Sequence, residues 1–525
     1  MGIFFSLPIL VIGISLFGEV GEMWSHIATY LLPQYLKNTT LLILGTSLLT
    51  VFLGVSSAWV VSRYEFRGRR TAEWLLFLPL AIPSYICAYA YVGIFGYGGS
   101  LGILGKSIGI LIPPLDMMNL YGLIWVLSFS LFPYVYAASR ASFLSNVASL
   151  RECATLLGAN ESRYFFTVAL PLSQPAIIGG LFLVIMELLN DYGAAKYYGI
   201  NTFTTGIFRT WTALEDFQSA IYLSALLVLL ILLLKGLEKL QRGRKSFETQ
   251  GRRSEGHVHM RISPKGWKNA LCVLLAWTPI GFGFILPFFQ LVRWAWLNVD
   301  IHAYWDVGSI AFQSFGLAFT TASLTLLFGL LLVYFSQWNP LKSFNFITKL
   351  ATTGYIIPGA IIGIGLIGVS QYVVDFFDDT FQLKIGFLIY GSSFVLIYAY
   401  IVRFLALAYT PIEANSLKIG RQLAEASYLL GKKPLKTLRS IEIPLLKQTL
   451  YGVFFLTFID TMKELPLTLL LKPYDVMTLA VKAFEYADDE RVAEASIPAL
   501  MLIGIVGTLL LLVNTKVLAE DKPSK

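Results

Sequence analysis

The sequence contains one polar segment twice, at an offset of 273 residues. The first copy is Glu152-Cys153-Ala154-Thr155-Leu156-Leu157-Gly158, and the second is Glu425-Ala426-Ser427-Tyr428-Leu429-Leu430-Gly431. In each copy the glycine lies six positions after the glutamate, and a proline (Pro171 or Pro444) lies thirteen positions after the glycine. A repeat with identical internal spacing at so large an offset indicates two fused copies of one architecture.

The same offset relates four acids that follow the repeated segments. It carries Glu187 onto Asp460 and Asp191 onto Glu464. Within each copy the two acids are four residues apart, a spacing that places both on one face of a helix. The repeat therefore extends beyond one loop.

Composition excludes a soluble protein of several domains. Of the 525 residues 56% are hydrophobic and 14% are charged, and the mean hydropathy is +0.67. Such a chain is expected to be an all-α integral membrane protein in a lipid bilayer. Its net charge of +8 is explained by membrane topology, so we expect no nucleic-acid partner.

Twelve apolar runs are long enough, or nearly long enough, to cross a bilayer. Six precede a basic segment and six follow it. They are 3–17, 39–62, 74–95, 121–138, 176–189, 220–234, 270–292, 311–335, 350–369, 385–408, 450–459 and 497–513. We predict a first six-helix half over residues 1–240, a cytoplasmic basic linker over 241–268 and a second half over 269–525.

The distribution of Lys and Arg predicts the orientation. Counted on alternate sides of these spans, 30 of the 40 basic residues share a side with both termini, the linker and both repeated segments. The excess of positive charge places that side in the cytoplasm. Because each half has an even number of spans, the halves run parallel and are related by a pseudo-twofold axis along the membrane normal.

Two glycine-rich stretches imitate nucleotide-binding motifs. Gly363, Gly365 and Gly368 fit GxGxxG but lie inside an apolar span, where small residues instead let helices approach closely. The stretch 99–107 is similar to a P-loop, but its first glycine is one residue too far from the lysine, and it falls on the predicted external side. No other stretch approaches these motifs, so we expect no nucleotide or other cofactor bound to this chain.

The repeated segment resembles the cytoplasmic loop of permease subunits of binding-protein-dependent ATP-binding-cassette importers, E-A-A-x3-G-x9-I-x-L-P. Here one alanine of each copy is replaced by another small residue, Cys153 or Ser427. The resemblance implies the type I importer permease fold. It also implies that a coupling helix in each loop docks onto an ATPase subunit, through Glu152, Ala154, Gly158, Glu425, Ala426 and Gly431. Both glycines are expected at positive φ.

Other segments are similar to fused ferric-iron permeases. They are 186–193 and 201–211 in the first half, and 460–471 and 488–491 in the second. This resemblance implies a multi-pass protein of the bacterial inner membrane that imports iron(III). Two copies of a separate ATPase and an external, periplasmic substrate-binding protein would be its partners. The chain itself would not be an enzyme.

The four matched acids are candidates for the translocation pathway. A carboxylate near the bilayer centre is costly, so Glu187, Asp191, Asp460 and Glu464 should face water or a partner. One reading is that Asp191 and Glu464 are solvated at the interface, with Lys196 and Lys463 as partners. The other is that all four line a central cavity and touch iron(III) transiently, since this hard cation prefers oxygen ligands.

Three alternatives stay open on the sequence. Thiamine, sulfate and polyamine permeases share the scaffold and the loops, so the substrate is less well determined than the class. A secondary transporter driven by an ion gradient fits the intramembrane acids but not the two matched docking loops. A membrane-embedded enzyme is disfavoured because the spans contain no cluster of catalytic residue types.

Overall fold

The protein is helical. The computed structural model describes residues 2–145, 154, 156, 158–242, 261–297, 301–338, 348–390, 392–420 and 422–519. Within these ranges, extended pairing is confined to a single bridge between Tyr64 and Ile262. Ten helical segments of the described residues are long and apolar enough to cross a membrane. The predicted all-α membrane fold is confirmed, with the type I permease arrangement of two helical halves.

The ten segments correspond to ten of the twelve predicted spans. The other two predicted spans are also helical: α1 has 14 residues, and α23 has 21 but carries Lys447, Asp460 and Lys463. These charged residues lower the hydropathy of α23, and α1 is short. The predicted boundaries of the halves and linker stay a prediction; residues 243–260 of the linker lie outside the described residues.

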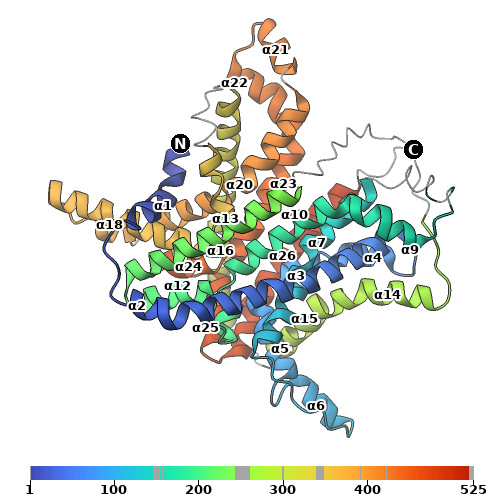
Figure 1. The fold of residues 1–525 in the computed structure, drawn as a ribbon. Coiled ribbons are helices and arrows are strands. Elements are labelled where there is room, and N and C mark those ends of the chain that lie inside the picture. The colour runs from blue at the N-terminus through green and yellow to red at the C-terminus, as the bar shows by residue number, and fades with distance from the viewer. Residues whose placement is uncertain are drawn as a thin grey trace.

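The first half consists of long helices joined by short helical turns (Figure 1). Its elements are α1 (Gly2–Ser15), α2 (Trp24–His26), η1 (Ile27–Leu31), α3 (Leu32–Arg63), α4 (Arg69–Leu75), η2 (Leu78–Ala81), α5 (Ser84–Phe95), α6 (Ser100–Ser107), α7 (Leu120–Ser145), α9 (Glu161–Tyr164), η3 (Phe165–Ala169), α10 (Leu170–Asn190), α11 (Gly193–Tyr197), α12 (Phe203–Thr212) and α13 (Phe217–Arg242).

The second half repeats this order. Its elements are α14 (Trp267–Ile280), η4 (Gly281–Ile285), α15 (Leu286–Leu297), α16 (Ile301–Trp338), η5 (Gly354–Ile356), α18 (Gly359–Phe381), α19 (Gly386–Tyr390), α20 (Ser393–Ile419), α21 (Gln422–Leu429), α22 (Pro434–Thr437), η6 (Leu438–Glu442), α23 (Ile443–Lys463), α24 (Pro466–Leu471), α25 (Leu479–Asp488) and α26 (Val492–Ala519).

The 273-residue offset holds residue by residue around the repeated proline. It maps α9, η3 and α10 onto α22, η6 and α23 with identical bounds. Both η3 and η6 are π-helical turns, each of five residues, directly before the turn that contains Pro171 or Pro444. A proline supplies no backbone N–H and crowds the carbonyl four residues earlier, so a widened turn lets the helix continue through it.

Two predicted spans are interrupted. The runs 74–95 and 350–369 do not form single helices, because each breaks at a matched Ile-Pro pair. Pro83 and Pro358 adopt nearly the same extended backbone, with φ of −55° and −52°, and α5 and α18 begin directly after them. A proline restricts the preceding residue to extended conformations, which explains the break. These two breaks lie beside the central cavity described below.

The halves exchange helices. The first-half helix α1 packs on α18 of the second half, and α14 of the second half packs on α3 and α4 of the first. A Cβ added at Gly365 would lie 2.5 Å from the Pro8 carbonyl oxygen of α1, so this glycine allows the close approach predicted for the GxGxxG stretch. The exchange makes both halves contribute to one core.

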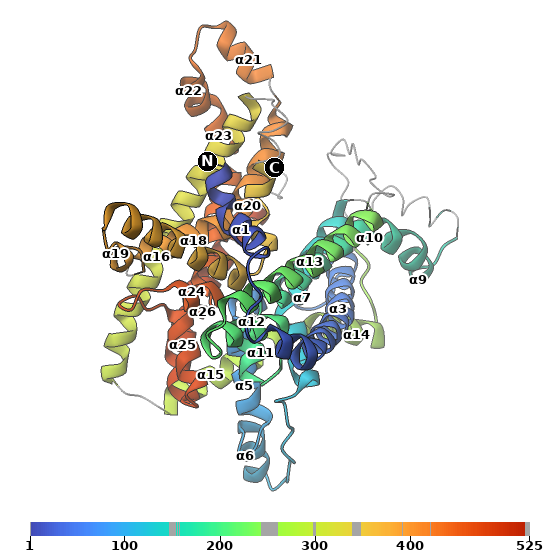
Figure 2. The same ribbon diagram turned by 60° about the vertical axis from the view of Figure 1, so that its left-hand side comes forward.

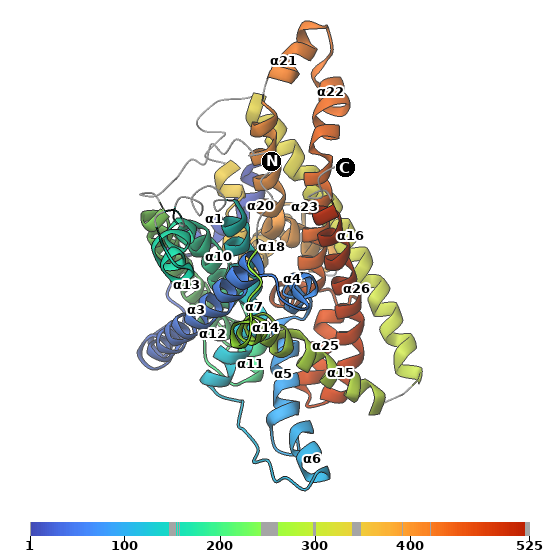
Figure 3. The ribbon, with the colours of Figure 1, turned by 90° about the vertical axis from the view of Figure 1, so that its right-hand side faces the viewer.

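Figures 1 and 2 show that the ends carrying the two repeated segments point apart. Helices α21 and α22 stand at the top of both views, whereas α9 lies at the far right. Figure 3 shows α6, which contains the P-loop-like stretch, at the end opposite to α21 and α22. The halves are therefore splayed at the ends that bear the repeated loops.

Candidate functional site

Each repeated segment ends in the same C-terminal helix cap. Gly158 and Gly431 have φ of 76° and 78°, which confirms the predicted left-handed conformation. The backbone N–H of Ala159 donates to the Ala154 carbonyl at 3.0 Å, and that of Lys432 donates to the matched Ser427 carbonyl at 3.1 Å. This six-to-one bond over a left-handed glycine is a Schellman motif.

The small residues of the repeat divide between two faces. In α21, Glu425 and Ala426 are exposed, whereas Ser427 is buried and its hydroxyl lies 2.8 Å from that of Thr437. Ala154, matched to Ser427, is partly buried against the core. Glu152 lies outside the described residues. The third position of the motif thus packs inward in both copies, and in α21 the first two positions face solvent.

Three exposed leucines were missed by the sequence reasoning. Leu156 is 87% exposed and the matched Leu429 is 89% exposed, and Leu430 beside it is 83% exposed. Their signal was in the sequence, since both copies of the repeat read Leu-Leu-Gly. Large apolar side chains held out from a loop indicate a surface that a partner covers.

All four matched acids line one cavity. Its volume is about 110 Å³, and Glu187, Asp191, Asp460 and Glu464 all contribute to its wall. The remaining lining residues come from both halves: Leu80, Ile82, Pro83, Ser84, Tyr85, Ser130, Leu131, Tyr134, Asn190, Tyr192, Gly193, Arg403, Phe404, Lys463, Leu465 and Pro466. The pseudo-twofold repeat therefore brings the acids together at the junction of the halves.

The outer acid of each pair is the residue at which its helix ends. Asp191 and Glu464 cap α10 and α23 with ψ of 110° and 123°, so they leave the helical register of Glu187 and Asp460. Asp191 accepts hydrogen bonds from the Ser84 hydroxyl and, at 2.9 Å, from the Ala194 N–H. Each acid thus ends one helix and stabilises the next short one.

Glu464 is held by its own chain. Its carboxylate accepts from the Leu467 N–H at 3.2 Å and from both the N–H and the hydroxyl of Thr468 at 3.1 Å. Arg403 Nε lies 4.0 Å from Glu464 Oε1, beyond hydrogen-bond distance. Glu464 is only 5% exposed.

The structure contradicts the reading of Glu464 as solvated, and that of Lys196 and Lys463 as partners of the outer acids. Glu464 is buried. Lys196 pairs instead with Asp488 at 2.6 Å, and Lys463 with Asp460 at 3.5 Å. Lys196 follows Asp191 and lies in α11, whereas Lys463 precedes Glu464 and lies in α23, one helical turn after Asp460.

Matched residues tie the two halves together across the cavity. Asn190 Oδ1 accepts from the Gly359 N–H at 2.8 Å and from Arg403 Nη1 at 2.9 Å. Lys463, matched to Asn190, donates to the Leu80 carbonyl at 3.3 Å. One connection reaches Gly359, the first residue of α18, and the other reaches Leu80, just before α5; each partner belongs to the opposite half. We call these contacts the cross-half ties.

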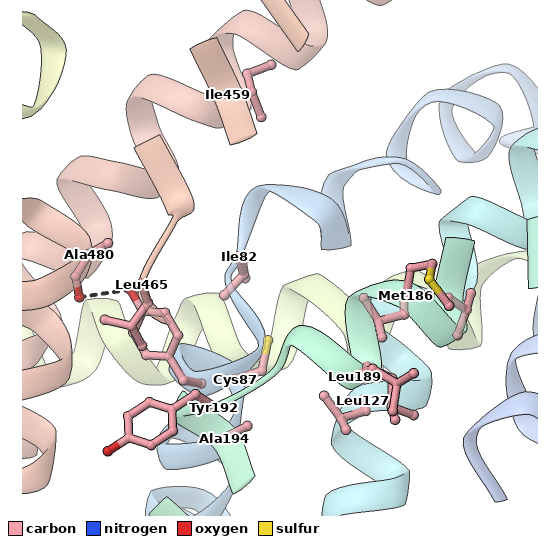
Figure 4. Close-up of a cluster of buried hydrophobic side chains, with 14 of the residues drawn as sticks. Ile82, Cys87, Leu127, Met186, Leu189, Tyr192, Ala194, Ile459, Leu465 and Ala480 are labelled. Carbon is pink, nitrogen blue, oxygen red and sulfur yellow. Dashed lines mark hydrogen bonds between the residues drawn. The ribbon is translucent and has the colours of Figure 1, made fainter. Parts of the chain in front are cut away.

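Tyrosines extend the same junction. The Tyr355 hydroxyl donates to Glu187 Oε1 at 3.1 Å. The Tyr85 hydroxyl donates to the Ala480 carbonyl at 3.0 Å, the bond drawn in Figure 4. That view also shows Ile82 and Tyr192 of the first half on the side of Leu465 of the second, and all three line the cavity. An apolar core of both halves therefore surrounds the polar cavity.

Arg403 is the main lining residue that sequence reasoning misplaced. It was counted with the basic residues of the second repeated loop, yet it lies within α20, is 4% exposed and lines the cavity. Removing Arg403 from one side and Lys463 from the other changes the charge split from 30:10 to 29:9, so the predicted orientation is unaffected. An arginine inside an apolar run was the available signal.

The cavity acids are not arranged as a metal cage. Among the described residues, no group of three or more His, Cys, Asp or Glu side chains is placed to hold a metal ion. The four carboxylates share a wall, but Asp191 and Glu464 are already engaged by backbone N–H groups. In this conformation the cavity can contact a passing cation without enclosing it.

Comparison with known proteins identifies the class. Residues 50–243 match the family described as binding-protein-dependent transport system inner membrane component. Over these residues the chain is similar to the permease component of binding-protein-dependent transport systems. It is 25% identical over 479 residues to the Fe(3+)-transport system permease protein FbpB 2 of Haemophilus influenzae, covering 90% of this chain and 88% of that protein.

Two further relatives match this chain over different lengths. The ferric transport system permease protein FbpB of Actinobacillus pleuropneumoniae is 23% identical over 487 residues, covering 87% of this chain and 68% of that protein. The molybdenum transport system permease protein ModB of Haemophilus influenzae is 32% identical over 148 residues, covering 27% and 61%. The permease is thus a multi-pass inner-membrane transport subunit of an importer.

Proposed function

We propose that this permease moves iron(III) from an external binding protein to the cytoplasm, by alternating access coupled to a separate ATPase. The observation that carries the proposal is the cavity at the junction of the halves, lined by four carboxylates at repeat-matched positions. Oxygen ligands suit a hard trivalent cation. The two relatives that match along most of the chain are named as iron permeases.

The repeated segments supply the coupling to ATP hydrolysis. Two matched loops, each presenting an exposed leucine before a Schellman turn, suit two copies of one ATPase subunit. ATP and Mg²⁺ would be bound there and not by this chain. Closure of the ATPase dimer would draw the splayed ends together and break the cross-half ties, which opens the cavity to the external binding protein.

The proposed orientation places both termini and the linker in the cytoplasm. A single cysteine introduced at Ser254, which lies outside the described residues, tests it directly. The thiol should resist membrane-impermeant maleimide in intact cells and react after the cells are permeabilised. Labelling in intact cells would reverse the orientation and remove the basis for coupling through the repeated loops.

A second candidate substrate is a free oxyanion. Arg403 and Lys463 line the cavity, and one shorter relative is named as a molybdenum permease. Four carboxylates against two cations disfavour an anion travelling alone, because like charges in a low-dielectric cavity repel it.

Uptake by a deletion strain distinguishes these substrates. The strain is complemented with this chain and supplied in turn with labelled iron(III), sulfate, molybdate and thiamine. Iron accumulation that stops when ATP is depleted supports the proposal. Accumulation of any other substrate in place of iron would reassign the cargo, and uptake that follows an ion gradient without ATP would make the protein a secondary transporter.

A further inference from the structure

The cations of the cavity do not follow the repeat. The four acids are matched between the halves, but Arg403 and Lys463 both belong to the second half. Their matched residues in the first half are Ser130 and Asn190, which are neutral and also line the cavity. The fold therefore forms this wall once without any cation, so the cations are not a requirement of the architecture.

Arg403 is not needed to satisfy the carboxylate beside it. Glu464 already accepts three hydrogen bonds from Leu467 and Thr468, and the matched Asp191 is satisfied by Ser84 and Ala194 with no cation. Arg403 approaches Glu464 no closer than 4.0 Å. The need to neutralise Glu464 therefore explains little of why Arg403 is buried beside it.

The guanidinium has an unused donor. Nη1 donates to Asn190, but Nε is buried and has no hydrogen-bond partner among the residues that the structure describes. A buried donor without a hydrogen bond is unfavourable, so such groups in native proteins usually bind a ligand or water. The fork of Nε and a terminal nitrogen is the geometry that arginine uses for carboxylate and phosphate groups.

The cavity acids need help to carry a trivalent ion. No three of them are grouped as ligands in this conformation, so an iron(III) ion that passes must keep oxygen ligands of its own. We propose that the cargo is iron(III) together with an oxyanion, whose metal-free oxygens bind Arg403 while the carboxylates contact the metal. This rests on the proposed iron transport and specifies the chemical class of the substrate.

Dual-label transport tests the proposal. The full chain is reconstituted in liposomes with its ATPase, and the binding protein is loaded with radioactive iron plus either radiolabelled inorganic phosphate or radiolabelled citrate. With wild-type permease, iron and one of the two anions should enter in nearly equal amounts and only with ATP. Arg403→Gln should lower entry of both labels together by about tenfold or more, because a charge-assisted hydrogen bond is lost.

Two further variants isolate the role of Arg403. Arg403→Lys keeps the charge but not the fork, so it should transport at an intermediate rate. Arg491→Gln removes an exposed arginine outside the cavity and should transport as wild type. The wild-type ratio of anion to iron decides the matter even if Arg403→Gln fails to assemble.

The outcomes separate the two claims. Iron that enters with both anions left outside, or that enters Arg403→Gln liposomes at the wild-type rate, would overturn the oxyanion proposal and leave iron transport standing. Wild-type liposomes that import no iron in either arm would instead contradict the proposed function itself, and the oxyanion proposal with it.

Discussion

The two halves of the permease solve the same structural problem in different ways. Each ends its cavity-lining helix at an acid, but the first half holds Asp191 with the Ser84 hydroxyl, while in the second half Gly359 lies against Glu464 and Arg403. Ser84 and Gly359 each follow the proline of a matched Ile-Pro break. The first half is neutral around its acid, and the second is crowded and cationic.

This difference separates features that the fold requires from features that could serve the transported substrate. Elements shared by both halves, such as the π turns, the breaks at Ile-Pro and the acids that end helices, are architectural. Features of one half, above all Arg403, are not imposed by the repeat. Variants at corresponding positions of the two halves therefore test whether the halves differ as the structure indicates.

The largest effect is expected at Gly359. A Cβ there would lie 2.7 Å from Glu464 Oε1 and 2.8 Å from Arg403 Nη1, so Gly359→Val should displace the buried pair, at about 3–5 kcal/mol, and abolish uptake. Ser84→Ala removes one hydrogen bond to Asp191 and should cost about 1–3 kcal/mol. Thermal unfolding in detergent and iron uptake measure both.

Gly504→Val provides the control, since nothing lies within 4 Å of a Cβ at that position in α26. It should unfold and transport as the wild type does. If Ser84→Ala proved as damaging as Gly359→Val, the halves would be equally crowded around their acids and the asymmetry described above would be mistaken.

Variants of the two coupling loops should differ less from each other than Gly359→Val differs from Ser84→Ala. Replacing Leu429 and Leu430 by Ser removes two exposed apolar side chains, each worth about 1.5–3 kcal/mol when a partner buries it. Copurification of the ATPase should fall by about tenfold or more. Leu156→Ser removes one such side chain from the first loop and should have a smaller effect. Leu435, an exposed leucine outside the repeated motif, serves as a control.

ATPase pull-down from detergent extracts measures these effects. Gly158→Val and Gly431→Val should add a cost of about 1 kcal/mol per site for a side chain at positive φ. Normal copurification by all of these variants would show that the ATPase docks elsewhere on the permease.

The cross-half ties should respond more weakly. Asn190→Ala removes acceptors for Gly359 and Arg403, which should destabilise the closed cavity by about 1–3 kcal/mol. Basal ATP hydrolysis without binding protein should then rise several-fold, because the outward-open state is easier to reach. Lys463→Met, at the matched position, loses one weaker bond to Leu80 and also the ion pair with Asp460. Unchanged basal hydrolysis in Asn190→Ala would show that the ties do not hold the cavity closed.

The smallest effect concerns pH and lies away from the cavity. Burial raises the pKa of Asp216, but hydrogen bonds from Ser219 and Met23 outweigh it and lower that pKa below its usual value. A lowered folded-state pKa stabilises the fold above the unfolded value of about 3.9 and loses that contribution as the pH falls through the folded pKa.

Asp216→Asn should therefore flatten the loss of thermal stability between about pH 5 and about pH 3. The matched Asp489 is exposed, and Asp489→Asn should leave the profile unchanged. If thermal stability fell equally with pH in Asp216→Asn and in the wild type, the hydrogen bonds to Asp216 would not stabilise the fold.

The repeat allowed much of this arrangement to be predicted. An offset read from one loop correctly related α10 to α23 and placed Glu187, Asp191, Asp460 and Glu464 at matched positions around one cavity. The positive φ of Gly158 was predictable because only glycine adopts it readily. The roles of these residues in coupling and transport stay predictions.

The remaining features depend on tertiary context. The breaks at Pro83 and Pro358 were missed because apolar runs on both sides conceal a short extended segment. Arg403 was assigned to a loop because charge counting treats a basic residue near the end of a span as cytoplasmic. Partners such as those of Asn190 could not be predicted, since they come from the other half and depend on how the helices cross.

The central claim is that carboxylates from both halves form the iron pathway. The most direct measurement is ATP-dependent iron uptake by Glu187→Gln combined with Asp460→Asn, compared with each single variant, in liposomes that retain wild-type basal ATP hydrolysis and binding-protein docking. The account predicts that the double variant imports no iron above background and that each single variant is partly impaired. Uptake by the double variant at the wild-type rate would contradict it and leave the four acids with a structural role alone.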